Sequence, residues 1–375
     1  MFNKLSKTCI AGSLLLASQL PLTALAAGEA IGAVYTMSNA AEGNSVLMFD
    51  RNQLGRLSPA GEFDTGGLGT GGGLGNQGAV IIDPANRWLF VVNAGSNDIS
   101  VFAIDEHGLT LVDREQSGGE QPISLTYSHN LLYVLNAGGA VGTADSITGF
   151  SVSADGMLTP VAGSTQSLSN ANTGAAQISF NNDGDVLVVT EKGTNLIDTF
   201  TVDANGAAGP AITHVSSGVT PFGFAIGRRD QVIVSEAAGG ATDQSSVSSY
   251  QLGKDGSLSL ISASIGTTET AACWAVVSND GRFTYTTNAG SNTISGYSIG
   301  FDGTLSLLDA DGQTASTGPD SGPLDMAVSS DGRNLYTLNG NNDTIGVFRL
   351  KPRGGLAARD SHINVPASAN GLAIR

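Results

Sequence analysis

The chain has 375 residues and carries 33 acidic against 17 basic side chains, a formal net charge of −16. Such a surface repels phosphate backbones and anionic membranes, so nucleic acid is not an expected partner. Only 13% of the residues are charged and 51 are glycine, a composition that predicts many short strands joined by tight turns.

Residues 1–27 have the pattern of a signal peptide: a basic start, a short apolar run and small residues before the expected cleavage after Ala26 or Ala27. We expect an exported product, periplasmic or extracellular, with no membrane insertion after cleavage. Cleavage removes Cys9 and leaves Cys273 alone, so an intramolecular disulfide is excluded and stability must come from a core.

Seven copies of one pattern then follow in residues 28–375: an apolar strand, a polar turn and an alternating strand. "LFVVNAGSNDISVFAI" and "TYTTNAGSNTISGYSI" are two of them. Successive copies lie 43 to 55 residues apart, a period typical of propeller blades. The residues that end the first strand of each copy are Asn39, Asn93, Asn136, Glu191, Glu236, Asn288 and Asn339.

Each copy is flanked by two further predicted strands. A short apolar segment such as "AAQISF" precedes it, usually followed by an Asp-Gly hairpin turn, and a segment such as "DGTLSLLDA" follows it. The first copy lacks the preceding segment, and "NGLAIR" at residues 370–375 has the missing pattern. The sequence therefore predicts an all-β, single-domain, seven-bladed β-propeller whose ring is closed by the C-terminal strand joining blade one.

This periodicity, "SxDGRxLYVxN…TIxxF", resembles the YVTN repeat of the lactonase family of seven-bladed propellers, which includes 6-phosphogluconolactonase and carboxymuconate lactonizing (cyclase) enzymes. Segments such as "TEKGTNLIDTF" and "VSEAAGG" are similar to an exported branch of that family. The resemblance covers the whole mature chain and implies a lactone hydrolase or a cyclase/isomerase. Relatives often carry Arg-His where an innermost strand starts, and here those places read "QPIS", "ACWA" and "PLDM".

The candidate catalytic residues are Glu191 and Glu236, which replace Asn in two adjacent blades. Equivalent positions in neighbouring blades are expected to bring the two carboxylates near one another at the mouth of the central channel. There they either act as acid and base, or hold a hard cation such as calcium, or cap backbone N–H groups as Asn does elsewhere.

The candidate substrate-binding residues lie at second-strand ends and at the starts of innermost strands. Lys192 either orients a substrate carboxylate or pairs with a neighbouring Glu, and Trp274 either stacks on a sugar ring or packs between blades. Cys273 is expected to be a buried small residue, since no histidine lies near it to activate a thiolate. The full set is Lys192, Trp274, Asp325, Gln177, Phe222 and Asn288.

The sequence lacks the motifs of several common kinds of catalytic and phosphate-binding site. The four histidines fall in outer strands or in turns on the face opposite the channel mouth, and no HExxH, CxxC or G-x-S-x-G motif occurs. "GLGTGGGLGNQG", residues 67–78, matches G-x-G-x-x-G twice, but a strand rather than a helix is expected after it. We therefore interpret it as a flexible loop between blades one and two, not as a phosphate cradle.

Together these patterns predict an exported lactonase-like propeller that recognises a small polar molecule at the channel mouth, with hydrolysis or isomerisation of a lactone or sugar acid as its chemistry. The alternative is a non-catalytic propeller that binds a protein, a glycan or a cation. No cofactor is predicted apart from the calcium alternative.

Overall fold

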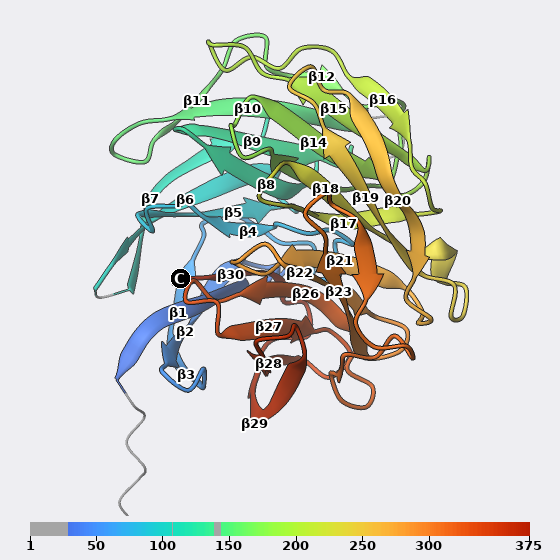
Figure 1. Ribbon diagram of the computed structural model, residues 1–375. Helices are drawn as coiled ribbons and strands as arrows, with labels where there is room; N and C mark the ends of the chain where they lie inside the picture. Colours follow the sequence, from blue (N-terminus) through green and yellow to red (C-terminus); the bar gives the residue numbers. More distant parts are fainter. Residues whose placement is uncertain (1–28, 107, 139–143) are drawn as a thin grey trace, which may run out of the picture.

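The computed structural model describes residues 29–106, 108–138 and 144–375, and within them seven antiparallel sheets surround a common axis (Figure 1). The predicted all-β, seven-bladed propeller is confirmed. The signal peptide predicted for residues 1–27 lies outside the described residues. The one helical segment among the described residues is a short 3-10 turn, η1 (Ala238–Gly240), and none of their helices is long and apolar enough to cross a membrane.

Every blade has four strands in the same order from the axis outward. The innermost strands are β30 (Asn370–Ile374), β4 (Val80–Ile82), β8 (Pro122–Ser128), β13 (Ala175–Phe180), β17 (Pro221–Ile226), β21 (Ala272–Val277) and β26 (Pro323–Val328). The second strands are β1 (Ala30–Met37), β5 (Trp88–Asn93), β9 (Leu131–Asn136), β14 (Val186–Glu191), β18 (Gln231–Glu236), β22 (Phe283–Asn288) and β27 (Asn334–Asn339).

The outer half of each blade is less regular. The third strands are β2 (Ser45–Asn52), β6 (Asp98–Asp105), β10 (Ser146–Val152), β15 (Leu196–Thr201), β19 (Ser246–Leu252), β23 (Thr293–Ile299) and β28 (Thr344–Leu350). The outermost strands are β3 (Leu57–Asp64), β7 (Gly108–Gln116), β11 (Leu158–Pro160), β16 (Ile212–Val215), β20 (Leu258–Gly266), β24 (Leu305–Leu307) and β29 (Leu356–Asn364). In blades three and six the short β12 (Gln166–Ser167) and β25 (Ala315–Ser316) also pair with the third strand.

The C-terminal strand closes the ring as the sequence predicts. β30 pairs with β1, with Ala373 opposite Tyr35 and Ile374 opposite Val34, so blade one takes three strands from the start of the chain and one from its end. This arrangement leaves no blade with an unfilled innermost position, the open edge that a linear array would expose.

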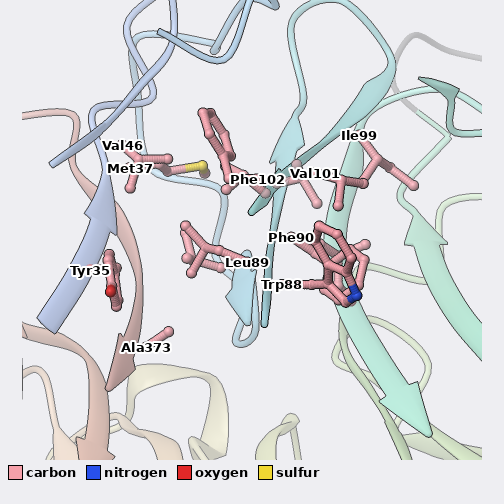
Figure 2. Packing of buried hydrophobic residues seen from close by; sticks show 14 of the residues in the cluster. Tyr35, Met37, Val46, Trp88, Leu89, Phe90, Ile99, Val101, Phe102 and Ala373 are labelled. Carbon is pink, nitrogen blue, oxygen red and sulfur yellow. The ribbon is translucent and has the colours of Figure 1, made fainter. Parts of the chain in front are cut away.

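The core lies between neighbouring blades. Figure 2 shows it between blades one and two, where Tyr35 and Met37 of β1 face Leu89 of β5 and Phe102 of β6. All six residues of β5 are buried, because a second strand packs against a neighbouring blade on each face. This explains why second strands such as β5 (WLFVVN) and β9 (LLYVLN) are nearly continuous apolar runs in the sequence.

Buried tyrosines of the second strands also join neighbouring blades by hydrogen bonds. In three blades the phenol donates to the carbonyl of the glycine that ends the turn between the third and fourth strands of the next blade. The pairs, each 2.8 Å apart, are Tyr133 with Gly206, Tyr285 with Gly354, and Tyr336 with Gly55. The last pair spans the junction between blades seven and one, where the buried Arg51 guanidinium also lies 3.1 Å from Asp331. Polar contacts therefore reinforce the closing junction.

Tyr336→Phe keeps the ring but removes its hydroxyl, so the Gly55 carbonyl loses its hydrogen-bond donor. We expect a loss of about 1–3 kcal/mol in the free energy of unfolding, measured by urea denaturation, since a buried acceptor is left unsatisfied. Tyr127→Phe is the matched control, because the Tyr127 hydroxyl bonds only the nearby exposed Asn130 side chain. Equal losses in the two variants would contradict a specific role of the phenol at the closing junction.

Candidate functional site

The channel has two different ends. We call the entry face the end at which the innermost strands begin, and the exit face the end at which they turn into the second strands. The sequence predicts the site at the entry face. There the Gly-rich stretch, together with the glycine before it, forms a segment of residues 66–78, which we call the channel loop.

The channel loop reaches across the ring. The Gln77 side chain donates to the Ala275 carbonyl at 2.9 Å and accepts from the Ala275 N–H at 3.1 Å, so its amide pairs with β21 of blade six as a strand would. The Gln77 backbone N–H donates to Ala176 of blade four at 3.1 Å. A connector between blades one and two thus bonds to strands on other sides of the channel.

Further contacts hold the channel loop in place. The Trp274 indole N–H donates to the Asn76 carbonyl at 2.5 Å, and the Leu125 N–H donates to Gly78 at 2.9 Å. A Cβ at Gly69 would lie 2.1 Å from the Asn39 carbonyl carbon, so only glycine permits this close approach. The predicted strand after the loop is confirmed as β4, but the loop is bonded into the channel entrance rather than spanning the blades as a free linker.

Lys192 lies beneath the channel loop. Its ammonium donates to the Gly75 carbonyl and to the Ala175 carbonyl, the latter at 3.2 Å, and it stands 4.6 Å above the Phe222 ring. Burial lowers its pKa to about 8. These contacts correct the expectation that Lys192 meets a substrate carboxylate, because its donors are directed at backbone carbonyls of the closed entrance.

Phe222, Trp274 and Cys273 belong to the same buried cluster. The Phe222 and Trp274 rings are 5.0 Å apart, and Trp274 is only 4% exposed, so it packs between elements and offers no open face for a sugar. Cys273 is 7% exposed and burial raises its pKa to about 12, which keeps it a thiol. The predicted buried, unreactive cysteine is thus what the structure contains.

Glu191 is fully buried and is bonded to its own blade and to the segment that leads into it. Its carboxylate accepts from the Ser169 N–H at 3.0 Å and from the Ser169 and Thr194 hydroxyls, both at 2.5 Å. Its neighbour is Asp198 of β15, whose pKa is raised to about 7 by burial and then by the adjacent Glu191 carboxyl. Asp198 was missed by the sequence analysis, although "NLIDTF" places an acid one strand away from Glu191.

Glu236 is equally buried but bonds only groups of its own blade and of the segment leading into it. It accepts from the Gly218 N–H at 2.8 Å and from the Ser248 and Ser246 hydroxyls, the former at 2.5 Å. None of the hydrogen bonds of the described residues joins Glu191 to Glu236. The expected acid/base pair is therefore not assembled, because each carboxylate is directed into its own blade.

The contacts of the equivalent asparagines explain this arrangement. Asn136 donates to the Ser117 carbonyl, and Asn93 accepts from Thr65, both in the segment that leads into the respective blade. Glu191 and Glu236 bond the corresponding segments through Ser169 and Gly218, which favours the capping alternative for both. Asn288 is also internal, since its amide donates to the Thr293 and Ser295 hydroxyls.

Gln177 and Asp325 lie instead on the channel beyond the loop. They line a cavity of about 300 Å³ whose floor includes Gln77 and whose walls extend to Tyr127 and Pro84, near the ends of the innermost strands. We call it the channel cavity. Because its walls extend to those strand ends, it opens toward the exit face, opposite the predicted mouth.

Asp325 is the acidic side chain among the described residues that line the channel cavity. It is 4% exposed, and its carboxylate accepts from the Met326 N–H at 2.8 Å. Burial raises its pKa to about 8. Gln177 stands on β13 with both ends of its amide bonded to Phe224, at 2.7 and 3.0 Å. The carboxyl of Asp325 is thus neutral near neutral pH and becomes ionised in mild base.

Among the described residues, no group of three or more His, Cys, Asp or Glu side chains is arranged so that it could bind a metal ion. His129 lies in the turn after β8, and His214 and His362 lie on the outer strands β16 and β29, as the sequence predicts. His107 is outside the described residues.

Comparison with known families agrees with this architecture. The model of the family described as "Lactonase, 7-bladed beta-propeller" matches residues 34–167, 143–273 and 246–369. The chain belongs to this lactonase family. No curated protein sequence matches it.

Two solved structures of other proteins illustrate the similarity in fold. A putative 6-phosphogluconolactonase from Bacteroides fragilis superposes with a TM-score of 0.70 at 18% identity, over 92% of this chain and 98% of the other. The periplasmic gluconolactonase PpgL of Pseudomonas aeruginosa gives a TM-score of 0.71 at 18% identity over the same shares. At this identity the similarity concerns the fold.

Gln77→Ala leaves both the N–H and the carbonyl of Ala275 unpaired and should release the channel loop. We expect faster amide hydrogen exchange in residues 66–78 and a red-shifted emission of Trp274, which loses its bond to Asn76. Because the chain has two tryptophans, all proteins in this comparison also carry Trp88→Phe, so that the emission comes from Trp274 alone. Gln53→Ala, in an exposed turn, is the control. Unchanged exchange in the loop would show that Gln77 does not hold it.

Asp325→Asn tests the burial of a neutral carboxyl. The folded pKa of Asp325, about 8, is above its unfolded value, so the folded state keeps a proton that the unfolded chain has lost. Stability of this chain should fall as pH rises from about 4 to about 8, and the asparagine variant lacks that component. We expect the difference in Tm, variant minus natural chain, to grow over this range, measured by calorimetry at several pH values. A difference independent of pH would contradict the prediction.

Proposed function

We propose that this protein is an exported lactonase that hydrolyses a small polar lactone in the channel cavity, with Asp325 as the general base. The observation that carries the proposal is the position of the Asp325 carboxyl: buried, on an innermost strand, and lining a cavity in the channel. Its volume of about 300 Å³ is at the lower end of the range of small-molecule sites.

The chemistry requires one proton to move twice. Ionised Asp325 takes a proton from a water molecule, which attacks the lactone carbonyl carbon and forms a tetrahedral intermediate. The ring C–O bond then breaks, and the departing oxygen takes the proton back from Asp325, giving the open hydroxy acid. A raised pKa makes the ionised carboxylate a stronger base toward water. The protonated carboxyl can still give the proton to the departing alkoxide, because the alkoxide is a much stronger base than the carboxylate.

The other polar groups of the cavity suit recognition. Thr126 accepts from the Phe180 N–H at 3.0 Å, which leaves its own hydroxyl proton for a substrate oxygen. Gln77 and Gln177 are bonded to backbone and act as rigid walls. A polar ring with several hydroxyls fits such a lining better than an apolar ligand does.

Two observations support the finer parts of the proposal. The signal-peptide pattern in residues 1–27 supports export, and one structural neighbour is a periplasmic gluconolactonase by its title. That neighbour makes aldonolactones the first substrates to try. The alternative of a non-catalytic binding propeller would be favoured by a lactone that binds without being consumed.

The test is hydrolysis of a panel of aldonolactones, followed by acid release and corrected for spontaneous opening. We expect kcat/KM to rise with pH through about 8, as Asp325 ionises. Asp325→Asn should lower kcat by about 10²–10⁴-fold. A Glu191→Gln, Glu236→Gln double variant should retain turnover if it folds, since both carboxylates are capping groups. Full activity of Asp325→Asn would overturn the assignment.

A further inference from the structure

The exit face carries a concentration of positive charge that contrasts with the acidity of the chain. A cleft of about 500 Å³ between blades six and seven is lined by four basic side chains. Arg282 and Arg333 come from the turns after the innermost strands, Arg349 from β28 and Lys351 from the turn after it. A protein with net charge −16 would be expected to neutralise such a cluster internally.

Most of this charge is not neutralised. Arg282 is paired with Asp280 at 2.6 Å, and the other acid of the cleft, Asp331, is engaged by the buried Arg51. Within the described part of the chain, no hydrogen bond or ion pair engages the charged ends of the three remaining side chains. These are Arg333, Arg349 and Lys351. The cleft therefore presents three cationic ends to solvent.

A second cleft continues the first toward blade five. It has a volume of about 230 Å³, shares Asp280 and Arg282 with the first, and adds Arg228, Arg229 and Phe301. Phe301 is 87% exposed, and the Arg229 guanidinium lies 4.4 Å from the centre of its ring. A largely exposed phenylalanine with an arginine beside its ring is a ready stacking surface. We call the two clefts together the basic groove.

We propose that the basic groove binds an acidic polysaccharide, a chain of uronic acid residues. Its carboxylates would pair with Arg333, Arg349 and Lys351, and one sugar ring would stack on Phe301. The fold repeats its turns from blade to blade, so arginines recur in blades five, six and seven, as carboxylates recur along such a polymer. The exposed Phe301 ring beside this positive charge favours a glycan over an acidic protein segment, because a sugar ring can stack on it.

This site is separate from the channel cavity and does not depend on the proposed lactonase activity. None of its residues lines that cavity. It also lies on the exit face, whereas the sequence predicts a site at the entry face.

The test is calorimetric titration of the natural chain with a galacturonate hexamer, at low and at high salt. We expect binding at low salt that weakens as salt rises, because the contacts are exposed ion pairs. A neutral galactose hexamer should not bind. Absence of galacturonate binding at low salt would overturn the proposal.

Matched variants locate the site. Arg333→Gln, Arg349→Gln and Lys351→Gln together should weaken binding by about 10-fold or more. Removing the same charge elsewhere, with Arg56→Gln, Arg359→Gln and Lys254→Gln, should change it by less than about twofold if the groove is the site. Equal weakening by both triple variants would mean that net charge alone attracts the polymer and would overturn the site.

Phe301→Ala separates a glycan from a generic polyanion. We expect it to weaken galacturonate binding while leaving its dependence on salt unchanged, because stacking is not ionic. Poly-glutamate should bind more weakly than galacturonate and should be insensitive to Phe301→Ala. Tighter binding of poly-glutamate would instead favour an acidic protein partner and contradict the glycan assignment. Thermal melts of each variant control for folding.

Discussion

The inner edges of the seven sheets set the constraint on which the channel is built. An innermost strand has a partner on one side only, so its other row of N–H and C=O groups faces the channel and needs partners. In this propeller side chains supply several of them. Gln77 pairs with Ala275, Gln177 pairs with Phe224, and the Ser124 hydroxyl accepts from the Ile178 N–H at 3.1 Å. The backbone of the inner ring is satisfied by residues that would otherwise be free to bind a ligand.

This requirement decides which end of the channel is open. Gln77 can reach Ala275 only if the channel loop enters the ring, and the loop then covers Lys192, Phe222 and Trp274. Asp325 is different, because its carboxyl accepts from the Met326 N–H yet still borders a cavity. Both proposed sites, the channel cavity and the basic groove, accordingly lie toward the exit face.

The repeat made the fold predictable to the level of single strands. The residue ending the second strand was placed correctly for six of the seven blades, and in blade one the strand ends at Met37, two residues before the predicted Asn39. β30 was recognised from its pattern alone. The candidate site was harder to predict from the sequence, because it depends on contacts between blades. Nothing in "GLGTGGGLGNQG" indicates that Gln77 bonds to a strand 198 residues later, and a pattern of Asn or Glu at one position does not reveal that both cap the same kind of segment. Asp325 was predicted as a candidate from its position near the start of an innermost strand, but the cavity that it lines opens away from the predicted mouth.

The most direct test is a crystal structure of the Asp325→Asn variant soaked with an aldonolactone. Our account predicts the lactone in the channel cavity, with its carbonyl beside residue 325 and the channel loop still bonded to Ala275. A lactone bound at the entry face, beside Lys192 and Trp274 with the channel loop displaced, would contradict it.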